Sequence, residues 1–189
     1  MHEILRSHIL DRLGSSLPDL DTVLSRFAPR SFRRGAMILQ AGEVCRQCLF
    51  VVRGCIQVFV YDSEGNEMTR DFAVEESWLV EISSFMQQTP AQENFRAAER
   101  TEVLAIGPED FREMMAQVPP FEQMYRQIME RSYANSVFRL NTFIAMDGLE
   151  RLRWMIAHQP RLMTRLSSRA IASYLGISPE TLSRLKAKL

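Results

Sequence analysis

The 189-residue sequence has little of what a secreted or membrane protein needs. Its three cysteines, Cys45, Cys48 and Cys55, are too few and too clustered for an extracellular disulfide framework. No run of about eighteen apolar residues is present, and charged residues interrupt the apolar pattern at the amino terminus. These absences exclude a membrane-spanning helix and a secretory signal, and they predict a cytoplasmic protein with no membrane partner.

The sequence also lacks the motifs of the common enzyme classes. It contains no P-loop, no G-x-S-x-G and no H-E-x-x-H, and its three histidines are far apart along the chain. Cys45 and Cys48 form a C-x-x-C pair, which can be a redox pair or half of a metal site, but no spacing supplies two further ligands. We therefore predict no enzyme, no metal and no cofactor. The cysteines are interpreted as buried thiols, with redox sensing as the alternative.

The formal net charge of +0 conceals an uneven distribution. Residues 149–189 contain eight Lys or Arg against two Asp or Glu, a local charge of +6, and the rest of the chain contains 15 against 21, or −6. A basic carboxyl-terminal region on an acidic body is typical of a protein that binds a polyanion at one end. Chance variation in a small surface-rich domain is the alternative.

Apolar spacing divides the first 106 residues into two parts. Residues 2–27 follow a mostly helical spacing with a break near Gly14 and Pro18, which predicts two short helices. From about residue 31 to 106, short apolar runs alternate with turn residues, which predicts a small antiparallel barrel or sandwich. In "YDSEGNEM" we expect a hairpin turn with Gly65 at a positive φ. The other glycines between the runs are Gly35, Gly42 and Gly54.

A helical region follows the predicted strands. Pro108 and the acids after it favour a helix start, and the pattern pauses at Pro119–Pro120 before a long helix over residues 121–146. That helix has two apolar seams, so we expect it to pack on the barrel and on the same helix of a second copy. The alternative is that both seams pack within one monomer. The seam assigned to the dimer contains Met129, Tyr133, Val137, Leu140 and Ile144.

The last 24 residues, "LSSRAIASYLGISPETLSRLKAKL", predict two helices joined at Gly176. Ser178 is expected at the N-cap of the second helix, with Pro179 at its first position and Glu180 near the positive end of the helix dipole. The apolar residues recur where two steeply crossing helices interlock, as in a helix-turn-helix. A plain helical hairpin without DNA binding is the alternative.

One side of the second helix has side chains suited to base edges. Glu180, Ser183 and Arg184 lie at i, i+3 and i+4 in its exposed amino-terminal half. Arginine can bind guanine O6 and N7, and glutamate can accept from cytosine N4. An ordinary surface pair between Glu180 and Arg184 is the alternative.

The order of glycine-punctuated barrel, long helix and terminal helix-turn-helix resembles the Crp/Fnr family of bacterial transcription regulators over essentially the whole chain. The stretches "RRGAMILQAGE", "LFVVRGCIQVFVYDSEGNE" and "SPETLSRL" carry the resemblance. It implies an α+β fold: an antiparallel β-barrel of the cyclic-nucleotide-binding, double-stranded β-helix type, a long dimerisation helix and a carboxyl-terminal helix-turn-helix. The corresponding domains would be residues 1–113, 114–147 and 148–189.

The same resemblance implies the partners and the DNA-binding residues. The partners would be double-stranded DNA with a palindromic TTGA-like site, a second copy of the chain, RNA polymerase and an unidentified small effector. The residues predicted to contact DNA are Glu180, Ser183, Arg184, Thr181, Ser178, Arg169, Lys186 and Lys188.

The chain departs from the cyclic-nucleotide-binding members of the family at the predicted effector pocket. In "WLVEISSFMQQTPAQENFRAA", Glu81 is kept, but Val80 replaces a glycine, and Ala91 and Gln92 replace the arginine and serine that hold the phosphate. A cyclic phosphate needs a fixed cation and close main-chain N–H donors. We therefore predict that cyclic AMP and cyclic GMP are unlikely effectors, with Arg96 as an alternative anion ligand.

Two classes of function remain at this point. The favoured one is a homodimeric DNA-binding regulator with a degenerate sensor barrel. The other is a dimeric sensor or protein-interaction module that binds a different ligand and does not bind DNA.

Overall fold

The computed structural model describes residues 1–13 and 20–189. Helices α1 (His2–Leu13) and α2 (Leu20–Ser25) confirm the two predicted amino-terminal helices, and the predicted break near Gly14 and Pro18 lies outside the described residues. No helix in the described part of the chain is both long and apolar enough to cross a bilayer.

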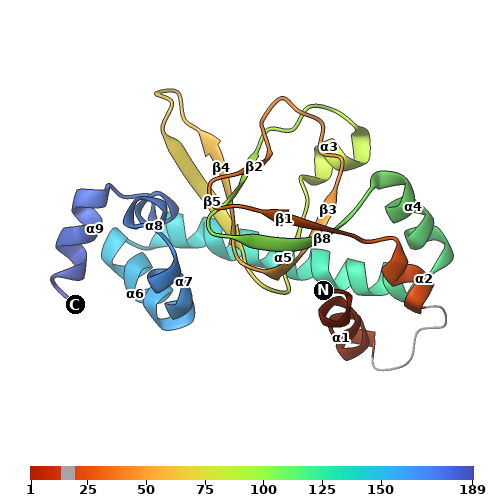
Figure 1. The fold of residues 1–189 in the computed structure, drawn as a ribbon. Helices are drawn as coiled ribbons and strands as arrows, with labels where there is room; N and C mark the ends of the chain where they lie inside the picture. Colours follow the sequence, from red (N-terminus) through yellow and green to blue (C-terminus); the bar gives the residue numbers. More distant parts are fainter. Residues whose placement is uncertain (14–19) are drawn as a thin grey trace. The chain divides into compact units, whose positions relative to one another are not determined.

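In the described part of the chain, eight strands form two four-stranded sheets, ordered β1-β8-β3-β6 and β2-β7-β4-β5 (Figure 1). The pairs β1–β8, β3–β8, β3–β6 and β2–β7 are antiparallel, with Ala28 opposite Ala105 and Cys48 opposite Ile106. This arrangement confirms the predicted fold class, an antiparallel β-fold with helices. The strands are β1 (Ala28–Phe32), β2 (Met37–Leu39), β3 (Cys48–Arg53), β4 (Ile56–Tyr61), β5 (Glu67–Ala73), β6 (Trp78–Leu79), β7 (Asn94–Ala97) and β8 (Thr101–Ile106).

Three elements of this region differ from the sequence-based expectation. Strand β1 begins three residues before the expected start at residue 31, and neither β6 nor helix α3 (Ile82–Gln87) was predicted. Strand β1 is mostly exposed and contains Pro29, which an edge strand tolerates because it does not need every N–H for pairing. Strand β6 has only two residues, too few to show alternation.

Two helices follow the sheets, α4 (Pro108–Gln117) and α5 (Pro119–Ala145). The predicted start at Pro108 and the predicted break before the long helix are both confirmed, but the break lies at Val118 and α5 begins on Pro119. The first N–H groups of a helix have no acceptor within the helix, so proline costs no hydrogen bond there.

The carboxyl-terminal part has four more helices: α6 (Gly148–His158), α7 (Pro160–Arg165), α8 (Ser168–Leu175) and α9 (Pro179–Lys186). Helix α6 starts with a capping box, in which Asp147 accepts from the main chain of Glu150 and the Glu150 side chain accepts from that of Asp147.

The chain forms two compact units. The first contains residues 1–58 and 72–130, and the second contains residues 59–71 and 131–189, so the outer part of the β4–β5 hairpin belongs with the carboxyl-terminal helices. This grouping does not test the predicted three-part division at residues 113 and 147, which stays a prediction.

An aromatic cluster occupies the core of the first unit. Trp78 lies edge-on to Phe121 and Tyr125, and Phe111 lies 4.9 Å from Tyr125 and 5.5 Å from Phe85 between ring centroids. Edge-to-face pairs of this kind are favoured by the ring quadrupoles. The cluster joins β6, α3, α4 and the first turns of α5 into one core.

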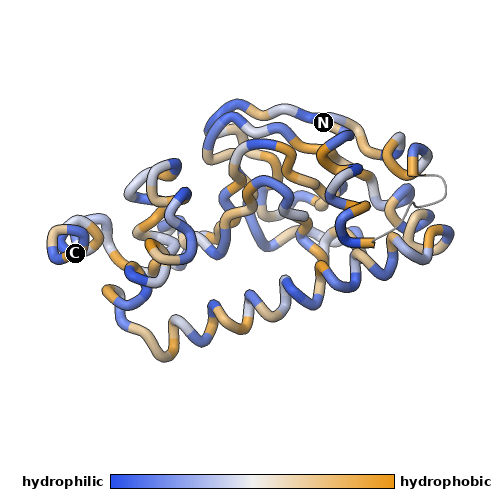
Figure 2. Tube along the Cα trace, turned by 90° about the horizontal axis from the view of Figure 1, so that it is seen from below, coloured by the Kyte–Doolittle hydropathy of each residue, from blue (hydrophilic) through white to orange (hydrophobic). Residues whose placement is uncertain are grey.

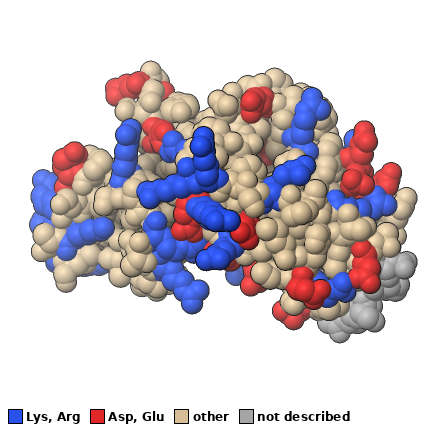
Figure 3. Space-filling model, viewed as in Figure 1, with Lys and Arg blue, Asp and Glu red and all other residues tan. Residues whose placement is uncertain are grey.

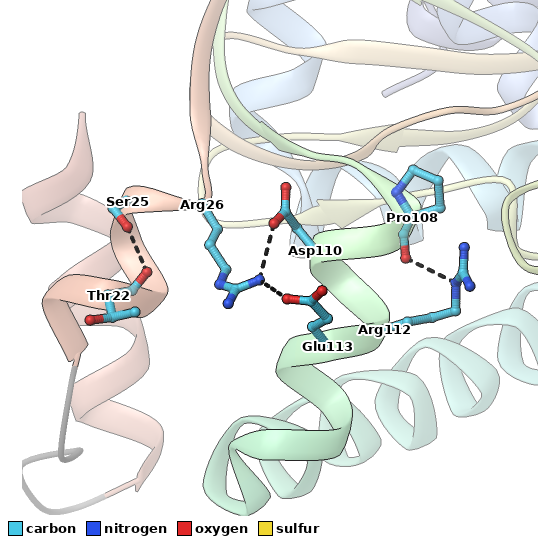
Figure 4. A network of polar contacts seen from close by, with 7 residues as sticks. All are labelled: Thr22, Ser25, Arg26, Pro108, Asp110, Arg112 and Glu113. Atoms are coloured by element: carbon cyan, nitrogen blue, oxygen red, sulfur yellow. Dashed lines mark hydrogen bonds and ion pairs between the residues drawn. The ribbon is translucent and has the colours of Figure 1, made fainter.

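A surface ion pair connects the amino-terminal helices to α4. Arg26 Nη1 lies 3.0 Å from Asp110 and 2.7 Å from Glu113, as Figure 4 shows. Hydrogen bonding to Glu113, together with the charges of both carboxylates, raises the pKa of Arg26. The contact fixes the end of α2 at the first turns of α4.

Candidate nucleic-acid interface and effector region

Helices α8 and α9 form the predicted helix-turn-helix, and the expected N-cap serine of α9 and turn glycine are at their predicted positions. Ser167 caps α8 by accepting from Ala170 N, and Ser178 caps α9 by accepting from Thr181 N at 3.1 Å. Gly176 lies between them with φ 65°, the left-handed conformation that the turn requires. Leu175 and Leu182 are buried where the two helices meet.

Gly176 also has a packing reason to be glycine. A Cβ at this position would lie 2.5 Å from Cε1 of Phe143 on α5. The main-chain N–H of Gly176 points back to the Ala172 and Ser173 carbonyls, which closes α8. A larger residue would therefore be strained both in φ and by the contact with the ring.

The residues predicted to contact DNA are exposed, apart from Thr181, which is half-buried. Leu182 faces inward, so Glu180, Ser183 and Arg184 project from the other side of α9. Among the described residues no ion pair joins Glu180 to Arg184. Hydrogen bonds from its own main-chain N–H and from Ser178 lower the pKa of Glu180, and the carboxylate is therefore held at the amino terminus of α9. The other exposed members of the predicted set are Ser178, Arg169, Lys186 and Lys188.

Charge on this end of the molecule is mixed but mainly basic. Figure 3 shows Lys and Arg atoms over the α6–α9 end, with a smaller acidic group beside them. The positive charge of this surface is complementary to the negative phosphate backbone of DNA. The basic residues predicted to contact DNA are all exposed.

Helix α8 is fixed to the β4–β5 hairpin within the second unit. Ser173 Oγ donates to the Glu67 carbonyl at 2.6 Å and accepts from Thr69 N at 2.8 Å. Arg139 of α5 donates through Nε to the Arg70 carbonyl at 2.9 Å and through Nη2 to the Tyr174 carbonyl. The sequence analysis did not single out Ser173 or Arg139, although a charged residue between two apolar seams, as at position 139, is a detectable signal.

In the predicted effector region, the Glu81 side chain stabilises the start of a helix. It is the N-cap of α3, where its Oε2 accepts from Ser84 N at 2.6 Å. Val80 beside it is half-buried against the core. The carboxylate kept from the family pattern therefore caps a helix in this structure.

No cation stands at the positions predicted to replace the phosphate ligands. Ala91 is buried, and its main chain pairs with the Gly42–Glu43 turn, while Gln92 is exposed. Arg96 is on β7 and donates to Gln57 Oε1 at 2.8 Å, a bond that anchors its guanidinium within the sheet.

The three cysteines are free thiols and are buried. Burial raises the pKa of Cys45 and of Cys48, and Cys45 Sγ donates to the Gln47 carbonyl at 3.4 Å. A raised pKa keeps a thiol protonated and unreactive at neutral pH, which favours the buried-thiol interpretation over redox sensing. Within the described part of the chain, no group of three or more His, Cys, Asp or Glu side chains is arranged to hold a metal ion.

The predicted dimer seam is exposed along the carboxyl-terminal half of α5. The relative exposures are 73% for Tyr133, 38% for Val137, 60% for Leu140 and 75% for Ile144, whereas Met129 is half-buried against the core of the first unit. In Figure 2 hydrophobic positions recur among hydrophilic ones along this helix. A large apolar seam of this kind on a single chain is available to a partner.

Comparison with known proteins shows which known domain the strand-rich part of the chain resembles. Residues 29–118 match the family model for the cyclic nucleotide-binding domain. The cAMP-activated global transcriptional regulator CRP of Salmonella typhimurium is 22% identical over 178 residues, which cover 89% of this chain and 85% of that protein.

Two solved structures share the fold. One, concerning the c-di-GMP-responsive global regulator CLP of Xanthomonas campestris, has a TM-score of 0.74 at 14% identity and covers 89% of both chains. The other, a Crp/Fnr-family transcriptional regulator from Eubacterium rectale, has a TM-score of 0.69 at 13% identity and covers 89% of this chain and 81% of that one. The matched relatives are regulators and not enzymes, in agreement with the sequence analysis. The domain match, the similarity to CRP and the shared fold agree with the resemblance of this chain to the Crp/Fnr family of regulators.

Proposed function

We propose that the chain is a homodimeric transcription regulator that binds double-stranded DNA by placing α9 of each copy in the major groove. The observation that carries this proposal is the exposed side of α9, from which Glu180, Ser183 and Arg184 project. Both α8 and α9 are capped, and the turn between them contains Gly176. Its relatives support it, since CRP is a transcriptional regulator by name. The operator would be a palindrome of TTGA-like half-sites whose centres lie about 34 Å apart. RNA polymerase stays a predicted partner.

Some of the predicted DNA-contacting residues would bind base edges, and others would bind phosphates. Arg184 can donate two hydrogen bonds to guanine O6 and N7, and Glu180 can accept from cytosine N4. The basic residues at the end of α9 and Arg169 at the start of α8 would bind phosphates and set the register without reading sequence.

We further propose that the barrel does not bind cyclic AMP or cyclic GMP in the mode usual for the family. Glu81 caps α3, Ala91 is buried and Arg96 is bonded to Gln57, so the residues at the predicted phosphate site supply no free cation among themselves. The effector, if the chain uses one, would have different chemistry from a cyclic mononucleotide.

Selection from random duplexes followed by a gel shift tests the DNA-binding proposal. The native chain should select a palindrome, and Arg184→Ala should weaken binding to it by about 1–3 kcal/mol per half-site and relax the preference at one base pair. Arg112→Gln is the matched control, since Arg112 is exposed on α4 in the first unit. Equal affinity of Arg184→Ala and native dimers for every duplex would instead support the protein-interaction alternative.

Titration calorimetry tests the proposal on the sensor domain. Neither cyclic AMP nor cyclic GMP should give saturable heat at micromolar concentration, because one charge-assisted phosphate clamp is missing. Tight binding of either nucleotide that is abolished by Glu81→Gln would contradict it, since that carboxylate would then contact the ligand.

A further inference from the structure

The second unit contains a cavity that the proposed DNA binding does not use. It has a volume of about 330 Å³ and lies among the middle of β5, the carboxyl-terminal half of α5, α6 and α8, elements labelled in Figure 1. Ligand sites in proteins start at about 300 Å³, so this cavity can hold a molecule of one or two fused rings.

One wall of the cavity is aromatic. Trp154 lies 5.2 Å from Phe138 between ring centroids and is stacked on His158 at 5.0 Å with an interplanar angle of 16°. Tyr174 of α8 lines another side. Flat rings with this spacing favour a planar, aromatic occupant, because such a ring can stack on the indole and keep edge contacts with the others.

Arg139 gives the cavity a positive group. Its guanidinium carbon lies 3.5 Å from the centroid of the Tyr174 ring, and Nε and Nη2 bond to main-chain carbonyls. A side-chain hydrogen bond also joins Arg139 to Tyr174. Burial lowers the pKa of Arg139, and the charge of Asp71 opposes this shift. Of the described charged residues that line the cavity, Arg70 and Arg139 stand against Asp71, so a monoanion would balance them.

Gln159 supplies a second polar feature. Its Oε1 is buried and accepts no hydrogen bond from any described residue, while its side chain hydrogen-bonds to that of Tyr174. A buried acceptor left unpaired costs free energy, about 1–3 kcal/mol, which a ligand N–H or O–H donor would recover. Because Gln159 lines the cavity, this acceptor is within the site.

We propose that this cavity binds a small planar aromatic carboxylate that also carries a hydrogen-bond donor on its ring. The ring would stack on Trp154, the carboxylate would pair with Arg139, and the donor would bond to Gln159 Oε1. Since Tyr174 is on α8, the ligand would contact the first helix of the helix-turn-helix directly. The site is independent of the proposed DNA binding, because its test measures ligand binding alone.

The probe is indole-3-carboxylate, and its matched uncharged analogue is indole-3-carboxamide. With ¹⁵N-labelled full-length protein, the indole N–H resonance of Trp154 should shift saturably, and that of Trp78, the other tryptophan, should not. Trp154→Phe assigns the two resonances. The carboxylate should bind at least tenfold more tightly than the carboxamide.

Two variants test the polar groups separately. Gln159→Glu changes the acceptor to an anion with little change of shape and should weaken carboxylate binding at least tenfold, and Arg139→Gln should do the same if it folds. Arg161→Gln, an exposed basic residue of α7, is the control and should bind as the native chain does. The proposal is wrong if Trp154 shows no saturable shift with millimolar carboxylate, if the carboxamide binds equally well, or if folded Gln159→Glu keeps native affinity.

Discussion

His8 shows how one buried ring fastens the amino-terminal helix to the sheets. Its Nε2 accepts from Trp78 Nε1 at 3.1 Å, which requires that nitrogen to carry no proton, and its Nδ1 lies 3.0 Å from Arg12 Nη1 and 3.4 Å from Glu76 Oε2. Burial lowers the pKa of His8, and the charge of Arg12 lowers it further, while Glu76 and Asp11 oppose the shift. A second proton on the ring would remove the acceptor for Trp78.

This pKa predicts a pH-dependent stability. The unfolded chain binds the proton at the ordinary pKa of 6.5 and the folded chain only at a lower pH, so stability falls as the pH drops from 6.5 to the lowered value and is flat below it. Urea unfolding at a series of pH values should show this loss in the native chain and in the control His158→Gln, and it should be reduced in His8→Gln. Parallel profiles for native and His8→Gln proteins would refute the prediction.

At the scale of elements, the Ser173 hydroxyl joins α8 to the edge of the β4–β5 hairpin. Strand β5 is at the end of its sheet, and Glu67 and Thr69, two residues apart, present their carbonyl and N–H on the same edge. Ser173 bonds to both groups and so covers part of an edge that could otherwise pair with another chain. The contact orients α8, and therefore α9, relative to the hairpin within the second unit.

Removing this hydroxyl should loosen the hairpin locally. Ser173→Ala should lower the free energy of unfolding by about 1–2 kcal/mol, since each hydrogen bond contributes about 0.5–1.5 kcal/mol net. Hydrogen exchange at the Thr69 amide should become faster. Ser136→Ala is the matched control, because the Ser136 hydroxyl bonds to the Ser132 carbonyl of its own helix. Native exchange at Thr69 in Ser173→Ala would show that the bond contributes nothing.

The elements that the sequence predicts well are those with local signals. The helix-turn-helix follows from Ser178, Pro179 and Gly176, because capping and turn chemistry depend on neighbours in sequence. The exposed strand β1 and the two-residue β6 have no period to detect, and their pairing is set by contacts distant in sequence. The cavity at Arg139 was not predicted for the same reason, since β5, α5, α6 and α8 supply its walls.

For the whole molecule, we expect the exposed seam of α5 to provide the dimer that the proposed function needs. Tyr133, Val137, Leu140 and Ile144 recur at spacings of four, three and four, the pattern of a two-stranded coiled coil. A palindromic operator requires two recognition helices related by a twofold axis, and pairing of this seam would provide that axis.

Leu140→Glu combined with Ile144→Glu should convert the dimer to monomers. Burying a Leu or Ile stabilises by about 1.5–3 kcal/mol, a symmetric dimer contains each residue twice, and the introduced carboxylates would repel across the interface. Sedimentation should then give the monomer mass of 21.9 kDa, with operator affinity reduced at least a hundredfold because each half-site is bound alone. Arg131→Glu, which places an acid on the opposite side of the same exposed helix, should remain dimeric. If the double variant is a dimer that binds its operator normally, the copies associate through another surface.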